Sequence, residues 1–193
     1  MIQFPTIQDK LFFEMTPLLP TTEYDDLSTS FHPYALARFS EISGLGVEME
    51  IFSFVALPEI SGSDDDFIET DDLIAVSFDF SPLKNRVLTF ICNAGKRCEM
   101  FLNGVSMGTY PCARRTGEDE RGVYWYVSLR LTPDTLQEYF GISSATELSS
   151  VRGNVFKYKK NAPHRHFGAV APFVKAYDVF DPENLADCPV IRM

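Results

Sequence analysis

The chain of 193 residues lacks the signals of several large protein classes. It contains one tryptophan and four cysteines, with no Cys-x-x-Cys pair, which gives little support for a zinc ribbon or a thioredoxin-like redox site. No apolar run approaches the roughly 18 residues of a membrane span. The N-terminus has neither a basic nor an apolar segment, so it does not read as a signal peptide, and a cytoplasmic location with reduced cysteines is expected.

Positive charge is also scarce. The formal net charge is −10, and residues 1–100 hold 17 acidic and 6 basic residues, against 10 and 11 in residues 101–193. Binding to DNA, RNA or an anionic membrane requires Lys and Arg to displace counterions, and an acidic surface is repelled instead. We therefore exclude nucleic acids and membranes as partners.

No arrangement typical of catalysis is found. A Gly-x-Ser-x-Gly nucleophile motif is absent, and no cysteine has a histidine partner that spacing identifies. Glu48 and Glu50 could be imagined as the carboxylate pair of a glycoside hydrolase, but their alternation with apolar residues is typical of the solvent face of a strand. An enzyme is not expected.

What the chain has in abundance is aromatic and β-branched sequence with period-two alternation. Seventeen Phe and eight Tyr favour the pleated surface of a sheet. Strands are predicted at residues 35–40 and 47–51 (a hairpin), 74–80, 87–92, 99–102, 123–131, 152–158 and 188–193. Many short strands indicate an all-β protein, namely a single-domain antiparallel β-sandwich with one short helix. Residues 1–34 are predicted as an irregular lead-in or edge strand, and 35–193 as the sandwich, one domain overall.

The predicted helix follows the strand at 123–131. Thr132 is a suitable N-cap, Pro133 fits the first helical position, and Gly141 lies just past the expected end. Residues 57–72, 114–122 and 161–168 are predicted as loops from their Pro, Gly and charged residues.

The order of these segments resembles the family 9 carbohydrate-binding modules and their stand-alone bacterial relatives. The residues that carry the resemblance are Arg152-Gly-Asn-Val-Phe-Lys-Tyr158, Pro163-His-Arg-His-Phe-Gly168 and the ending Phe180-Asp-Pro-Glu183. The resemblance implies a non-catalytic β-sandwich that binds a carbohydrate or related polyol at one end, sometimes with structural calcium. Where the family usually carries stacking tryptophans, this chain has residues 68–70 and Val170.

A sugar site needs flat aromatic faces together with side chains that hydrogen-bond hydroxyl groups. The guanidinium of Arg152 and the amide of Asn154 share a face of their predicted strand. The expected ligand-binding residues are Arg152, Asn154, Tyr158, His164, His166 and Phe167. Tyr177 lies beside the same segments, whereas Trp125, on an apolar strand face, is expected in the core.

The acidic segment that ends at Asp72 has two interpretations. It reads first as a solvated loop, and second as a calcium site built from Asp64, Asp66, Asp71 and Asp72. The spacing of an EF-hand is absent, and no further ligand for a metal at His164 and His166 can be located. No cofactor is required by any motif.

Two other functions stay open. A sandwich that lost its ligand would serve as a protein–protein interaction domain, for which an exposed apolar patch would be the sign. The wider DOMON-like group, which these modules resemble, includes haem-binding domains, but no axial ligand pair can be assigned here. The sequence names no sugar.

Overall fold

The computed structural model describes the greater part of the chain. The described residues are 4–6, 13–14, 34–42, 45–54, 60, 66–81, 86–95, 97–120, 122–144, 147–161, 165–171, 174 and 178–192. Of the site residues predicted from the sequence, Asp64 and His164 lie outside these ranges, as does Tyr177.

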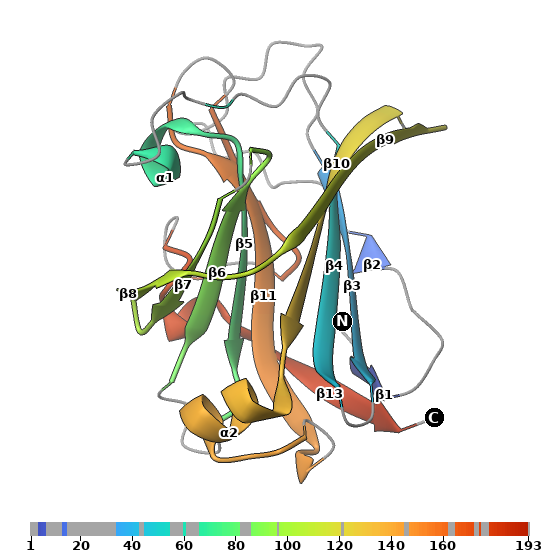
Figure 1. The fold of residues 1–193 in the computed structure, drawn as a ribbon, viewed down its shortest axis with the longest axis vertical. Helices are drawn as coiled ribbons and strands as arrows, with labels where there is room; N and C mark the ends of the chain where they lie inside the picture. Colours follow the sequence, from blue (N-terminus) through green and yellow to red (C-terminus); the bar gives the residue numbers. More distant parts are fainter. Residues whose placement is uncertain are drawn as a thin grey trace.

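Two stacked sheets form the fold, as Figure 1 shows. Within the described residues, an eight-stranded sheet has the order β1-β13-β11-β5-β6-β7-β8, with β12 paired to β11, and a five-stranded sheet has the order β2-β3-β4-β10-β9. All described pairings are antiparallel except that of β1 with β13. The prediction of an all-β sandwich is confirmed.

All eight predicted strands are present among the described residues, and β8, β9 and β12 add to them. The eight-stranded sheet contains β1 (Phe4–Thr6), β5 (Leu73–Asp79), β6 (Leu88–Asn93), β7 (Cys98–Leu102), β8 (Val105–Thr109), β11 (Ser150–Lys159), β12 (His166–Ala169) and β13 (Ala186–Arg192). The five-stranded sheet contains β2 (Phe13–Glu14), β3 (Tyr34–Ile42), β4 (Gly46–Phe54), β9 (Ala113–Asp119) and β10 (Gly122–Leu131). Within the lead-in, β2 is an edge strand next to β3, and β1 is an edge strand next to β13.

The predicted helix is α2 (Pro133–Phe140). Thr132 caps it by accepting a hydrogen bond from the Thr135 amide, and Gly141 ends it in a left-handed conformation, φ 73°. Leu136 and Phe140 are buried in the apolar cluster between the sheets. Helix α2 lies at the lower end of the sandwich in Figure 1. No helix in the described part of the chain is long and apolar enough to span a membrane.

Three loop predictions need correction. Residues 57–72 include a one-turn helix, α1 (Phe67–Thr70), anchored by the buried ring of Phe67. Residues 114–122 contain most of β9, and residues 161–168 contain most of β12. Both strands are held by backbone pairing to one neighbour, β10 and β11 respectively, so neither needed an alternating pattern of its own.

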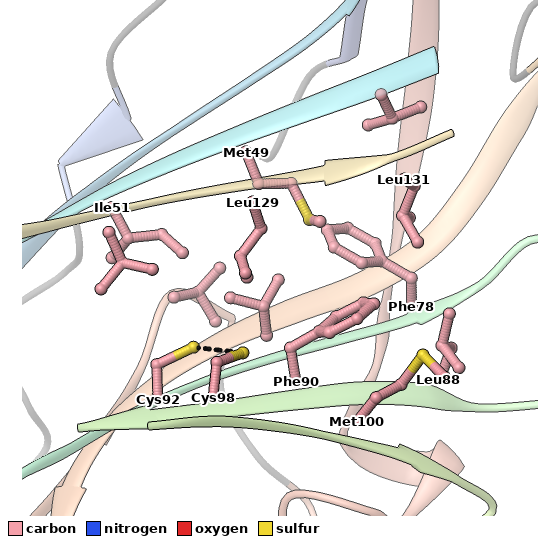
Figure 2. Close-up of a cluster of buried hydrophobic side chains, with 14 of the residues drawn as sticks. Met49, Ile51, Phe78, Leu88, Phe90, Cys92, Cys98, Met100, Leu129 and Leu131 are labelled. Atoms are coloured by element: carbon pink, nitrogen blue, oxygen red, sulfur yellow. Dashed lines mark hydrogen bonds between the residues drawn. The ribbon is translucent and has the colours of Figure 1, made fainter. Parts of the chain in front are cut away.

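An apolar cluster packs between the two sheets. We call the part of the inter-sheet space near α2 its α2 half, which includes Leu88, Met100 and Leu131. In Figure 2 the cluster extends from these three side chains to Ile51 and Cys92. We call the end of this space near α1 its α1 half. Trp125 is 2% exposed and belongs to the cluster, which confirms its predicted place in the core.

A second apolar cluster covers the outer face of the eight-stranded sheet. Phe67 of α1, Phe101 of β7, and Phe156 and Tyr158 of β11 meet there. Strand β11 is therefore buried on both faces, and each of its residues from Gly153 to Lys159 is buried. This double burial decides what its polar side chains can do.

Candidate functional site

Charged side chains occupy the α1 half of the inter-sheet space. On β11, the inward face that carries Val151 and Val155 near α2 carries Lys157 and Lys159 near α1. Lys157 is 0% exposed and Lys159 is 2% exposed. Buried ammonium groups are rare because they lose hydration, so each needs partners nearby.

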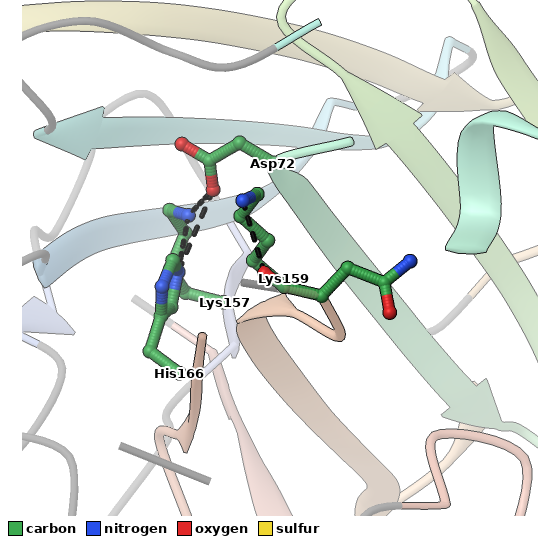
Figure 3. A network of polar contacts seen from close by, with 5 residues as sticks. Asp72, Lys157, Lys159 and His166 are labelled. Carbon is green, nitrogen blue, oxygen red and sulfur yellow. Dashed lines mark hydrogen bonds and ion pairs between the residues drawn. The ribbon is translucent and has the colours of Figure 1, made fainter. Parts of the chain in front are cut away.

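Lys157 finds its partners on two neighbouring strands, as Figure 3 shows. Its ammonium group donates to Asp72 Oδ1, just before β5, and lies 2.8 Å from Nε2 of His166 at the start of β12. His166 Nε2 is also 3.5 Å from Asp72 Oδ1. Because an ammonium only donates, Nε2 is assigned as the acceptor in its contact with Lys157. We call Asp72, Lys157 and His166 the buried triad.

Lys159 is satisfied locally. Its ammonium donates to the backbone carbonyl of Asn161 at 3.0 Å, where the chain leaves β11. The buried triad and Lys159 together fix how the β11–β12 connection leaves the sheet.

Helix α1 lies above this polar region and is tied to the β6–β7 turn. Asn93 donates to Asp71 Oδ2 at 2.7 Å and accepts from the Arg97 amide at 3.0 Å. The guanidinium of Arg97 lies 5.0 Å from the centre of the Phe67 ring, within the range of a cation–π contact.

The other side of α1 is tied to the β11–β12 connection. Lys160 forms an ion pair with Glu69 at 2.6 Å, and the Asn161 amide donates to the Glu69 carbonyl at 2.7 Å. Glu69 and Asn161 are exposed and Lys160 is partly exposed. We define the α1 end as the surface formed by α1, residues 93–95, Arg97 and residues 160–161.

Two further buried polar atoms lie on the five-stranded sheet. Trp125 of β10 faces Ser53 of β4 in register, and both are buried. Neither the indole nitrogen nor the Ser53 hydroxyl has a hydrogen-bond partner among the residues that the structure describes. The α1 half is thus the more polar part of the inter-sheet space on both sheets.

The predicted ligand residues are not gathered at one point. Arg152 and Tyr158 are six positions apart on β11, which corresponds to roughly 20 Å along a strand. The Arg152 guanidinium donates to the carbonyls of Pro182 (2.5 Å) and Leu185 (3.2 Å), near the η2 turn (Pro182–Asn184).

Asn154 has a structural environment. It is 0% exposed, its amide nitrogen donates to the carbonyls of Ala171 and Asn184, and its oxygen accepts from the amides of Val155 and Ala171. This side chain fastens the segment after β12 and the η2 turn to β11, because all of these partners are backbone groups.

Tyr158 and Phe167 pack against each other in the outer cluster. Their ring centres are 5.5 Å apart, and the residues are 2% and 3% exposed. Burial raises the pKa of Tyr158 above its ordinary value. Neither ring offers a free face to a ligand in this structure. Contact of the six predicted residues with a ligand stays a prediction. Of the five that the structure describes, only His166 lies in the α1 half.

The acidic residues of the calcium interpretation are dispersed. Asp66 is exposed, Asp71 accepts from Thr70 and Asn93, and Asp72 belongs to the buried triad. The described residues contain no group of three His, Cys, Asp or Glu side chains that could hold a metal ion. Calcium binding that involves Asp64 stays a prediction.

Sequence reasoning missed the buried triad and the α1 end. Lys157 and Lys159 alternate with Phe156 and Tyr158, a pattern that normally indicates one wet and one dry face. The available signal was the acidic pair Asp71-Asp72 placed directly before a strong strand, but the pairing of Asp72 with Lys157 spans 85 positions.

Comparison with known proteins supports the fold. Neither a protein-family model nor a curated protein matches the chain. A proposed carbohydrate-binding protein from Bacteroides uniformis matches with a TM-score of 0.67 and 13% identity, over 98% of this chain and 97% of that one. A family 9 carbohydrate-binding module from Caldicellulosiruptor kristjanssonii matches with TM-scores of 0.58 (with cellotriose) and 0.57 (with glucose), both at 7% identity over 100% of this chain, and over 94% and 97% of those chains. The chain therefore has the fold of these proteins, as its resemblance to family 9 predicted.

Proposed function

We propose that this protein is a non-catalytic carbohydrate-binding domain whose ligand lies against the α1 end. The observation that carries the proposal is the end-to-end match of the fold with three structures whose descriptions name carbohydrate binding, two of them with a bound sugar. Because one fold hosts many functions, the site itself must supply the remaining argument.

The α1 end has the side chains that hydroxyl groups require. Glu69 supplies a carboxylate, Lys160 an ammonium and Asn161 an amide, all placed by the mutual contacts described above. Arg97 adds a guanidinium that is held over Phe67. Such groups form directed hydrogen bonds to vicinal hydroxyls, and their fixed positions reduce the entropy lost on binding.

Stacking is the weak part of this site. Tyr158 and Phe167 are buried, and the large exposed apolar residues among those described are aliphatic: Leu45, Ile60, Val105, Met107, Val123 and Val174. A pyranose ring gains much of its affinity from an aromatic face. We therefore expect a dissociation constant of about 1 mM or weaker for a single sugar, with longer oligosaccharides binding more tightly.

Calorimetric titration and thermal shift with glucose and cellotriose test the proposal. The double variant Lys160→Ala, Asn161→Ala removes two groups of the α1 end, and we expect roughly a tenfold loss of affinity. Arg152→Ala, far along β11, is the matched control and should retain binding. Loss of binding in Arg152→Ala alone would move the site to the residues expected from the sequence. If neither these sugars nor a wider glycan panel binds at millimolar concentration, the carbohydrate proposal fails.

An interaction domain is the rival function. Its support is the edge strand β8, in which every residue is exposed and Val105 and Met107 are 66% and 46% exposed. A protein that binds no sugar but forms a complex abolished by Val105→Asp would favour this rival. The haem alternative predicts a Soret band in the purified protein.

A further inference from the structure

Three cysteines, from β6, β7 and the segment before β9, meet at the edge of the α1 half. Cys92 of β6 and Cys98 of β7 are directly opposite in register, with their sulfur atoms 2.9 Å apart, and Figure 2 shows both pointing into the same space. The next pair towards the turn is joined by the hydrogen bond from the Asn93 amide to the Arg97 carbonyl, 3.1 Å. Cys92 and Cys98 therefore occupy a non-hydrogen-bonded position, where Cα atoms are about 4.5 Å apart and within the range of a disulfide.

Cys112 joins this pair from the segment before β9. It is partly exposed, whereas Cys92 and Cys98 are 1% and 2% exposed. Its sulfur lies 3.7 Å from Nη2 of Arg114. The same guanidinium donates to the carbonyls of Gly95 and Arg97, which fixes it beside the cysteines.

The surroundings divide the three thiols into two kinds. Hydrogen bonds from Cys92 and Cys98, aided by the charge of Arg114 and opposed by burial, lower the pKa of Cys112 to about 3. The pKa of Cys92 is raised, mainly by burial, and that of Cys98 is raised, mainly by its hydrogen bond with Cys112. The partly exposed Cys112, beside the Arg114 guanidinium, is thus the thiol most favoured as a thiolate, and two buried thiols lie next to it. This is the arrangement of an oxidation-sensitive cysteine with resolving partners.

We propose that Cys112, Cys98 and Cys92 form an oxidation site. Hydrogen peroxide oxidises Cys112 first, and the final product is a disulfide between Cys92 and Cys98. The proposal is independent of sugar binding, because none of the three residues belongs to the α1 end as defined above. The substrate class is a small peroxide, which needs only the exposed part of Cys112.

The reaction balances in three steps. The Cys112 thiolate attacks one peroxide oxygen and the O–O bond breaks, which gives a sulfenic acid and, after protonation, water. The Cys98 thiol then displaces water from this sulfenic acid and forms the Cys98–Cys112 disulfide. Finally Cys92 loses its proton to solvent and attacks the sulfur of Cys98, which releases Cys112 as a thiolate; this proton replaces the one taken up in the first step. In sum, two thiols are oxidised and one peroxide is reduced to two molecules of water.

Peptide mapping by mass spectrometry after treatment with equimolar hydrogen peroxide tests the proposal. The wild-type chain should lose two hydrogen atoms and show Cys92 linked to Cys98. Cys112→Ser should slow this reaction at least roughly tenfold, because the remaining thiols are protonated. Cys92→Ser should accumulate the Cys98–Cys112 disulfide, and Cys188→Ser, on β13, is the control that should react like the wild type.

Three results would overturn the proposal: a wild-type disulfide that includes Cys188, a wild-type product that stops at oxidised Cys112, or an unchanged rate in Cys112→Ser. Circular dichroism of each reduced variant establishes that it is folded. Since wild-type mapping identifies the linked pair by itself, a variant that fails to fold still leaves the proposal open to refutation. Sugar titrations of the reduced wild-type protein test the proposed function separately.

Discussion

The two halves of the inter-sheet space share strands but differ in chemistry. Along the inner face of β11, Val151 and Val155 continue the apolar cluster, and two positions further the same face carries Lys157 and then Lys159. The α2 half is closed by the apolar face of α2, whereas the α1 half contains the buried triad. Both halves are equally buried, so burial alone does not decide which residues a sandwich accepts.

The difference teaches where stability comes from in this fold. Burying apolar surface contributes roughly 25 cal/mol per Å², so each large side chain of the α2 half adds about 2 kcal/mol. Burying the charged groups of Asp72 and Lys157 removes their hydration, which costs free energy. The attraction between the two charges offsets this cost but adds little net stability. We expect the α2 half to stabilise the protein and the α1 half to fix the orientation of α1 and the β11–β12 connection.

The largest expected effect is in the α1 half. Lys157→Ala leaves Asp72 buried without its cation and should lower the free energy of unfolding by about 3–5 kcal/mol, measured by urea denaturation. The double variant Lys157→Met, Asp72→Leu removes both charges and should recover most of that loss. If the double variant is as unstable as the single one, the charges themselves stabilise the fold and the comparison of the halves is wrong.

The next effect is in the apolar cluster. Leu129→Ala on β10 should lower the free energy of unfolding by about 3 kcal/mol, because it removes buried methyl groups and leaves a cavity. Val123→Ala is the control on the same strand, since Val123 is 42% exposed, and should change it by less than about 0.5 kcal/mol. Equal losses from the two substitutions would contradict this account of the cluster.

A smaller effect is expected at the N-terminus of α2. Thr132→Ala removes the acceptor for the Thr135 amide and should cost about 1 kcal/mol, visible as a lower melting temperature. Thr132→Ser keeps the hydroxyl and should retain most of the stability. Because this helix closes the α2 half, sugar binding at the α1 end should be unchanged, and a parallel loss of binding would mean that the two ends are coupled.

The smallest effect comes from outside both halves and is seen only at high pH. Burial, together with the hydrogen bond to Glu50 at 2.5 Å, raises the pKa of Tyr126 to about 12, against about 10 in the unfolded chain. The raised pKa favours the protonated folded state, so this contribution is complete below pH 10 and is lost as the pH rises towards 12. Denaturation midpoints between pH 8 and 11.5 should fall less steeply in Tyr126→Phe, and equal slopes would exclude this residue as the cause.

The sequence predicted the elements whose signals are local. Alternation placed β5, β10 and β11, and the Thr132, Pro133 and Gly141 triplet placed α2 to the residue. The sequence did not predict β9 and β12, because these strands are defined by pairing with a neighbouring strand and not by a pattern of their own. The buried triad was not predicted either, because Asp72 and Lys157 are far apart in the sequence and come into contact only when β5 pairs with β11.

Arg152 illustrates a different limit of sequence reasoning. Its strand was predicted correctly, and a guanidinium suits a polyol. In the structure, however, Arg152 donates to a backbone carbonyl of the η2 turn, Asn154 also binds backbone carbonyls, and Tyr158 packs against Phe167. The face of a strand can be inferred from alternation, whereas what covers that face depends on segments far away in the sequence, such as the η2 turn.

The short connection from β8 to β9 has a mechanical consequence. β8 is an edge of one sheet and β9 is an edge of the other, so the chain between them bridges the two layers, and Arg114 of β9 adds hydrogen bonds to the β6–β7 turn. The two sheets are thus connected along this side of the sandwich. We expect thermal fluctuations of one sheet relative to the other to be smallest along this side. A ligand at the α1 end would then contact a surface that is more rigid next to the β6–β7 turn and more flexible farther from it.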